Sequence, residues 1–98
     1  MQIVFSRFAL LDLEDAYFWY ESERSGLGSD FSNHVQKALD HIRHMPYAAT
    51  SINKRLRRKT LGRFPYGIVY RVEHDIISVE AIMHEKRDPN AWQQRVYH

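Results

Sequence analysis

The sequence contains no cysteine in its 98 residues. This absence excludes disulfide bonds, thiolate chemistry and cysteine-ligated zinc, and it fits a reducing compartment. The sequence also lacks an apolar run of about eighteen residues, the length that a membrane-spanning helix needs, and its start, MQIVFSRF, has no signal-peptide pattern. We therefore expect a cytoplasmic protein that does not enter a membrane and whose core depends on packing alone.

With 98 residues the chain is long enough for one hydrophobic core and too short for two, so we expect a single domain over residues 1–98. The net charge of +2 hides an uneven distribution, since residues 1–53 carry four Lys or Arg against seven Asp or Glu, and residues 54–98 carry ten against five. Such asymmetry is typical of a face for an acidic partner or for nucleic acid, although a solvated basic strand produces it just as often.

The first half of the sequence predicts a short strand followed by two helices. Residues 3–6 are rich in β-branched and aromatic side chains, and Ser6 can cap a helix that starts near Phe8. The apolar residues of this helix recur at spacings of three and four, at Leu10, Leu13, Tyr17 and Tyr20.

The glycines of residues 25–28 predict a tight break, after which Ser29 or Asp30 can cap a second helix that Pro46 ends. The apolar face of this second helix comprises Phe31, Val35, Ala38, Ile42 and Met45. Helices joined by so short a turn are expected to pair antiparallel.

The second half predicts an antiparallel meander. Residues 46–53 have no period and indicate a loop, and strands are expected at residues 55–62, 66–73 and 76–84. In the last strand we expect one face to be dry and to meet the helices, and the other to be mixed. The dry face holds Ile77, Val79, Ala81 and Met83, and the mixed face holds Ser78, Glu80, Ile82 and His84. Beyond this strand, Asp88 and Pro89 predict the start of a short C-terminal helix that contains Trp92.

The densest positive charge, KRLRRKT at residues 54–60, precedes the central apolar strand. Alternation places Arg55, Arg57 and Lys59 on one face of their strand, which we expect to be the face that the helices leave open, close to Arg71. Guanidinium groups on such a face would bind phosphate or carboxylate groups.

The histidines suggest two further functions, metal binding and proton transfer. His41 and His44 are three residues apart in the second predicted helix, near His34, and could bridge a metal ion. No carboxylate or cysteine completes an obvious ligand set, so we expect no metal and no cofactor. His84 ends a predicted strand, where a structural hydrogen bond to the following backbone competes with a role in proton transfer.

A series of residues spread over almost the whole chain carries a family resemblance. Its members are Tyr17, Trp19, Tyr20, Glu21, Leu27, Gly28, Phe31, Pro46, Arg63, Phe64, Pro65, Tyr66, Tyr70, Arg71, His84, Arg87, Asp88, Pro89 and Trp92. In order and spacing the series resembles the RelE/ParE superfamily of bacterial toxins. The resemblance implies an α+β fold in which a two-helix antiparallel hairpin packs on one face of a small twisted antiparallel β-sheet, with a short C-terminal helix. It also implies the toxin of a type II toxin–antitoxin (plasmid stabilisation) module, neutralised in a hetero-oligomer by a cognate antitoxin protein.

One branch of this superfamily cleaves messenger RNA on the ribosome, a reaction that needs an activated 2′-hydroxyl, a stabilised phosphate and a protonated leaving oxygen. Members of the branch use an arginine before the Leu-Val-Tyr of the central strand, another after the last strand and often a tyrosine beyond it. Alignment on residues 68–70 places Gly67 at the first position and Arg87 at the second, while Trp92 or Gln93 falls at the third.

Two of these three residues are therefore missing. Substitutes for the phosphate-binding charge could be Arg63, Lys59 or Arg71, and His84 or Glu85 could act as the acid or base.

The ParE branch is the closer resemblance, through residues 64–66 and through His84 with residues 87–89. This branch is associated with poisoning DNA gyrase, which implies inhibition by binding rather than by enzymatic chemistry. We therefore expect an inhibitor of DNA gyrase, with a ribosome-dependent mRNA endoribonuclease of the RelE type as the alternative. The residues expected to bind the target or the antitoxin are Arg55, Arg57, Arg58, Lys59, Arg63, Arg71, Arg87, Trp92 and Arg95.

Overall fold

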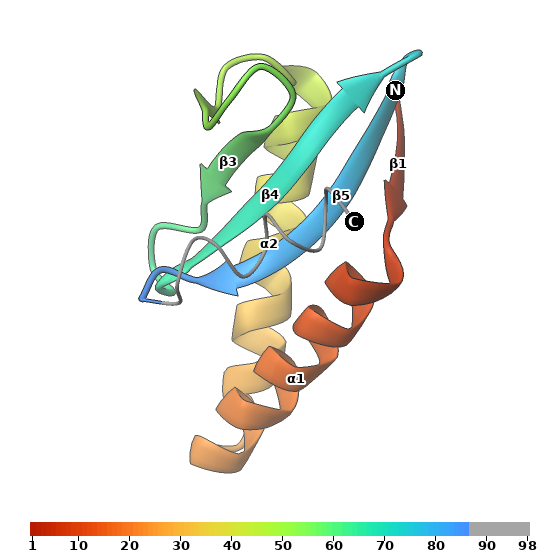
Figure 1. Ribbon diagram of the computed structural model, residues 1–98. Helices are drawn as coiled ribbons and strands as arrows, with labels where there is room; N and C mark the ends of the chain where they lie inside the picture. Colours follow the sequence, from red (N-terminus) through yellow and green to blue (C-terminus); the bar gives the residue numbers. More distant parts are fainter. Residues whose placement is uncertain (87–98) are drawn as a thin grey trace.

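The computed structural model describes residues 1–86 as a five-stranded sheet with two helices packed on one face (Figure 1). The elements are β1 (Gln2–Phe5), α1 (Arg7–Glu23), α2 (Leu27–His44), β2 (Thr50–Ser51), β3 (Arg57–Thr60), β4 (Tyr66–Glu73) and β5 (Ile76–His84). The strand order is β1-β5-β4-β3-β2. The predicted α+β fold with a two-helix hairpin is thus confirmed, and the short C-terminal helix predicted around Trp92 lies outside the described residues.

The sheet is mixed, so the prediction of a purely antiparallel sheet was wrong for its first strand. β1 runs parallel to β5, with Gln2 beside Ile76 and Phe5 beside Val79. A tight hairpin imposes antiparallel pairing, but β1 and β5 are joined by all the intervening elements, a connection long enough for parallel pairing. The meander β3-β4-β5 is antiparallel, as predicted.

A β-bulge in β5 exchanges the two faces of that strand. Tyr70 pairs with Val79 and the adjacent Val69 pairs with Ala81, so Glu80 has no partner in β4. As a result Ile82 lies in the core between sheet and helices and is 2% exposed. The predicted dry face was therefore wrong beyond the bulge, because a strict period of two cannot register an inserted residue.

The outer face of the sheet has a small apolar cluster of its own. Ala81 and Met83 lie there with Leu56 and Val69, and all four are buried. Because Leu56 belongs to this outer cluster, the next residue in the chain, Arg57, points to the opposite face of the sheet. Arg57, paired with Tyr70, lies on the helix-covered side of the sheet, contrary to the prediction.

The helix α1 turns a different face to the sheet from the one expected. Its buried residues are Ala9, Asp12 and Ala16, whereas Leu10 is 53% exposed. The small alanine side chains allow α1 to approach β5 closely. Part of the predicted apolar stripe therefore remains at the surface, and the prediction that Leu10 is buried was wrong.

The helix α2 begins at Leu27, earlier than the predicted caps at residues 29–30. Its first N–H groups are satisfied from α1, because the carboxylate of Glu21 accepts hydrogen bonds from Gly26 N and Gly28 N at 3.0 Å each. Gly26 adopts a φ of +89°, and a Cβ at Gly28 would lie 2.8 Å from the carbonyl oxygen of Tyr17. Glycine at these positions thus fixes the tight hairpin.

The face of α2 is otherwise as predicted, with Phe31, Val35, Ala38 and Ile42 buried. Met45 is 55% exposed, so its assignment to that face was wrong. The residues predicted as a loop before β3 include the short strand β2, which pairs with Arg57 and Arg58.

Candidate functional site

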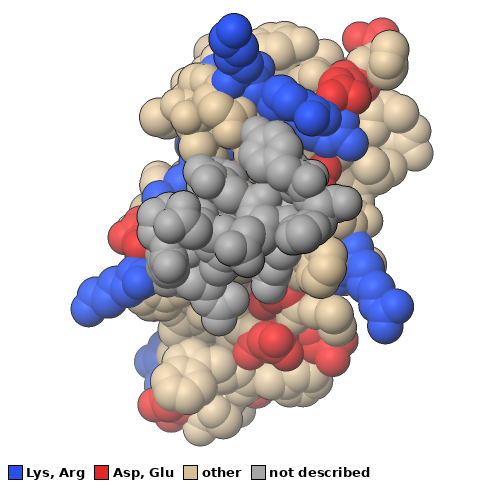
Figure 2. All heavy atoms as spheres, viewed as in Figure 1, with Lys and Arg blue, Asp and Glu red and all other residues tan. Residues whose placement is uncertain are grey.

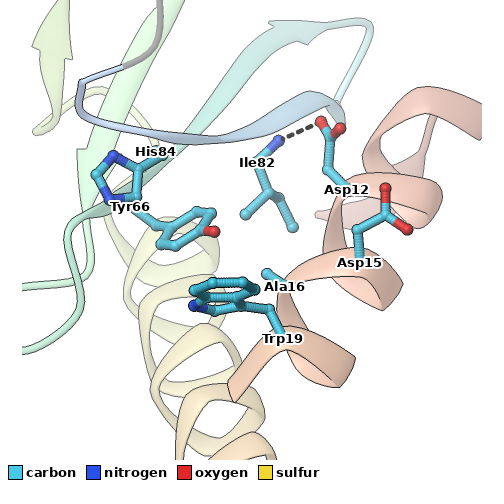
Figure 3. Close-up of a pocket in the computed structure, with 7 residues that line it drawn as sticks. All are labelled: Asp12, Asp15, Ala16, Trp19, Tyr66, Ile82 and His84. Carbon is cyan, nitrogen blue, oxygen red and sulfur yellow. Dashed lines mark hydrogen bonds between the residues drawn. The ribbon is translucent and has the colours of Figure 1, made fainter. Parts of the chain in front are cut away.

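Of the described side chains proposed for ribonuclease chemistry, His84 and Lys59 lie in different hollows. His84 lies on the α1 side of the sheet, where it lines a pocket together with Trp19 and Asp15 (Figure 3). Lys59 lines a groove on the opposite flank, against α2. Arg63 lies in the loop between β3 and β4, with its guanidinium 5.6 Å from the centre of the Phe64 ring.

One ring nitrogen of His84, Nδ1, is occupied by a structural hydrogen bond. Its Nδ1 accepts a hydrogen bond from the backbone N–H of Lys86 at 3.0 Å, and its ring packs edge-on against Tyr66 at 5.2 Å. The donated N–H requires Nδ1 to carry the lone pair, so the neutral ring has its proton on Nε2. This geometry matches the structural role considered for His84.

Gly67, at the position of the first ribonuclease arginine, is buried in β4. A Cβ placed there would overlap the side chain of Arg58 on the neighbouring strand. A larger side chain at this position therefore requires Arg58 to move.

Two of the predicted binding cations are already neutralised by carboxylates on the outer face. Arg71 forms ion pairs with Glu73 and, at 2.9 Å, with Glu80, and Arg55 approaches Glu73 at 3.4 Å. The hydrogen bonds that Arg71 donates to Glu73 and then to Glu80 raise the pKa of Arg71, and the hydrogen bond and charge of Arg71 hold the pKa of Glu73 below its ordinary value. Arg71 and Arg55 are thus part of a charge network within the sheet.

Arg57 is committed to the backbone. Its guanidinium donates to the carbonyl oxygens of Tyr47 at 3.0 Å and Ala49 at 2.9 Å. The hydroxyl of Tyr70 donates to the carbonyl oxygen of Pro46 at 2.7 Å, and burial raises the pKa of Tyr70. Together these two side chains hold the segment after α2 against the sheet.

Besides Arg57, which donates to backbone carbonyl oxygens, three of the predicted cations in the described part of the chain make no ion pair there, namely Arg58, Lys59 and Arg63. On the outer face of the sheet, Lys and Arg side chains lie across the upper part and at both flanks, while the largest group of Asp and Glu side chains lies lower, over α1 (Figure 2). The remaining predicted binding residues, Arg87, Trp92 and Arg95, lie outside the described residues.

The helical hairpin carries an apolar groove on its surface. The groove has a volume of about 600 Å³ and lies between α1 and α2. It is lined by Leu10, Leu13, Glu14, Tyr17, Phe18 and Ser32. Phe18 is 61% exposed, an unusual exposure for a large aromatic side chain. The signal available in the sequence was the width of the apolar pattern of α1, which is too broad for a single buried stripe.

A smaller pocket of about 230 Å³ lies between α1 and the end of β5 (Figure 3). Beyond the end of β1, side chains of the α1 region satisfy the open edge of β5. Ser6 donates its hydroxyl to the carbonyl oxygen of Glu80 at 3.0 Å, and the carboxylate of Asp12 accepts the N–H of Ile82 at 3.0 Å. Asp12 is therefore a structural carboxylate at the base of the pocket.

Within residues 1–86, no group of three or more His, Asp or Glu side chains is placed to hold a metal ion. In α2, Nδ1 of His34 lies 2.8 Å from the carbonyl oxygen of Asp30, and Nδ1 of His44 lies 2.9 Å from that of Asp40. No helix in the same part of the chain combines the length and apolar character needed to span a bilayer.

Comparisons with known proteins agree with the fold. Residues 3–89, most of the chain, match the family described as the ParE toxin of the type II toxin-antitoxin system parDE. A solved structure described as the chromosomal ParDE TA system from P. aeruginosa matches with a TM-score of 0.64 and 21% sequence identity, over 86% of this chain and 95% of that chain. No curated protein matches. A family match over this length, on the fold described above, shows that the chain belongs to the ParE toxin family of type II toxin–antitoxin systems.

Proposed function

We propose that this chain is a toxin that inhibits DNA gyrase by binding it, without covalent chemistry of its own. Membership of the ParE family of a toxin–antitoxin system implies an antitoxin as partner. The identity of the toxin's target is the part that we propose. Inhibition by binding depends on surface complementarity and residence time rather than on a poised acid and base.

The observation that supports binding is the separation of the residues that could have served a ribonuclease. Cleavage of RNA requires an acid, a base and a cation around one phosphate. Here His84 and Lys59 line different hollows on opposite flanks of the hairpin, and Nδ1 of His84 already accepts a backbone hydrogen bond. The loss of even one transition-state donor commonly costs about 10² to 10³ in rate.

We further propose that the groove between α1 and α2 holds an amphipathic helix of the antitoxin. The groove exposes Leu10 and Phe18 beside the half-buried Tyr17, and a contiguous apolar surface of this kind marks a binding site for a protein. An amphipathic helix matches such a groove in shape, because its apolar residues recur on one side every three or four positions.

Among the described residues, the proposed contacts with the target are the predicted cations that have neither a carboxylate nor a backbone carbonyl as partner, namely Arg58, Lys59 and Arg63. Arg55, Arg57 and Arg71 have structural partners, so their charge is less available to a target. The tail residues Arg87, Trp92 and Arg95 remain proposed contacts on the basis of the sequence.

Two assays on one preparation of the protein test this function. Purified gyrase supplied with relaxed plasmid should lose supercoiling activity and accumulate cleaved DNA when the protein is added. A translating system should show no cleavage of messenger RNA at the same concentration. Addition of the antitoxin encoded beside the toxin gene is the control, and it should restore supercoiling. Codon-positioned cleavage of RNA that His84→Ala abolishes would overturn the proposal and establish a ribonuclease.

A further inference from the structure

A groove between α2 and the end of β3 is lined by basic and neutral side chains only. It has a volume of about 380 Å³. Its lining residues are His34, Lys37, Ala38, His41, Lys59, Thr60, Leu61 and Gly62. Neither Lys37 nor Lys59 forms an ion pair within residues 1–86. Two ammonium groups and two imidazoles thus converge on one hollow without a carboxylate.

Secondary structure explains why these side chains converge. His34, Lys37 and His41 are spaced by three and four residues in α2, which places them along one side of the helix. Lys59 pairs with the core residue Ile68, so it lies on the face of β3 that α2 covers. The groove therefore has cationic groups from both of its walls.

The groove lacks the anchors that a protein partner would need. The large apolar residues that are strongly exposed lie elsewhere in the described chain, on β1 and α1 or just after α2. Protein interfaces draw most of their energy from buried aromatic and aliphatic anchors, whereas interfaces with nucleic acids are more polar and more positively charged. Lysine binds phosphate groups as a point charge.

We propose that this groove binds the phosphodiester backbone of DNA. The choice of DNA rests on the proposed function, because gyrase acts on DNA and a toxin bound to it meets the same duplex. Lys37 and Lys59 each contact a phosphate, and the imidazole rings of His34 and His41 line the groove beside them.

Fluorescence anisotropy with a labelled DNA duplex of about 20 base pairs tests the proposal through its salt dependence. For the full chain, the logarithm of the association constant should fall linearly with the logarithm of salt concentration. The double variant Lys37→Gln/Lys59→Gln should lose about 1.8 from that slope, at about 0.9 per phosphate contact, which is about 60-fold in affinity at 0.1 M salt.

The matched control is Arg7→Gln/Lys54→Gln, which removes the same net charge outside the groove and should retain affinity within about threefold of the parent. Thermal melting of each variant checks that it is folded. An equal loss of affinity in groove and control variants would overturn the proposal, because net charge alone would then explain binding. Groove-dependent binding of polyglutamate that is as tight as that of DNA would also overturn it, in favour of an acidic protein partner.

Gyrase inhibition measured on the same preparations separates this inference from the proposed function. Inhibition of gyrase without DNA binding would defeat the inference and leave the function standing. Groove-dependent DNA binding without inhibition of gyrase would defeat the function and, with it, the assignment of gyrase-bound DNA as the ligand.

Discussion

Asp12 shows how a single residue can join helix and sheet. It is the one buried charged residue among those that the structure describes, 9% exposed, and its carboxylate accepts the N–H of Ile82 at the open edge of β5. The spacing of the large apolar residues of α1 gives no sign that Asp12 is buried, because the residues that α1 buries beside it are the small ones, Ala9 and Ala16.

Replacing Asp12 with alanine should destabilise the fold by about 2 kcal/mol, because the buried N–H of Ile82 would lose its partner. Asp12→Asn retains an acceptor oxygen and should cost less. Urea denaturation measures the free energy of unfolding of each variant. The exposed Asp15 provides the control, and Asp15→Ala should change stability by no more than about 0.5 kcal/mol. If Asp12→Ala were as stable as Asp15→Ala, the assigned role of Asp12 would be wrong.

Glu73 predicts a dependence of stability on acid. Arg71 lowers the pKa of its carboxyl from the ordinary value of 4.5, so the native state favours the ionised form. The resulting stability is present above the unfolded-state pKa and is lost as the pH falls through the lower, folded-state value. The urea midpoint of the parent should therefore fall on acidification below about pH 4.5 more steeply than that of Glu73→Gln. The difference between the two should shrink in high salt, since the pair is exposed. Identical pH profiles would show that the pair does not contribute.

At the scale of elements, α1 has two apolar faces with different roles. One face uses alanines to pack on β5, and the other contributes Leu10 and Phe18 to the groove of the hairpin. A buried helix and a helix that awaits a partner have the same apolar composition. The sequence could therefore predict that α1 exists but not which of its faces meets the sheet.

The proposed antitoxin groove leads to a prediction for this element. Leu10→Ser/Phe18→Ser should weaken the complex with the antitoxin by about 2 kcal/mol or more, because exposed anchors dominate the energy of such interfaces. The stability of the free protein should change little, since both side chains are more than half exposed. Calorimetric titration with the antitoxin gives the affinity. Met45→Ser removes an equally exposed apolar side chain outside the groove and is the control. A loss of affinity shared equally by both variants would exclude the groove as the docking site.

Strand boundaries and faces show the same division between what the sequence could and could not predict. β4 and β5 have the bounds that the sequence predicted, residues 66–73 and 76–84. The turn between them uses His74 and Asp75 at positive φ. The faces beyond Glu80 were not predictable, because a bulge depends on the register of a partner strand. The short strand β2 was also missed, since two residues are too few to show a period.

For the whole molecule, the distribution of charge was visible in the sequence, but its geometry was not. The excess of positive charge after residue 53 was expected to cover the open face of the sheet. In the folded chain Arg55 and Arg71 are paired with carboxylates, and Lys59 faces the flank of α2. Residues close in sequence were thus distributed over several surfaces, and the basic groove joins Lys59 to α2, a helix that ends at His44.

The parallel pairing of β1 with β5 sets the order of events during synthesis of this toxin on the ribosome. β1 is made long before its partner, residues 76–79, which lie more than seventy positions later in the chain. Until β5 is made, the alanine face of α1 also lacks its packing partner, because α1 packs on β5. Contacts between such distant parts of a chain form slowly. The sheet therefore cannot be completed until β5 has been made, so a fragment of the chain that stops before Ile76 lacks the scaffold on which α1 packs.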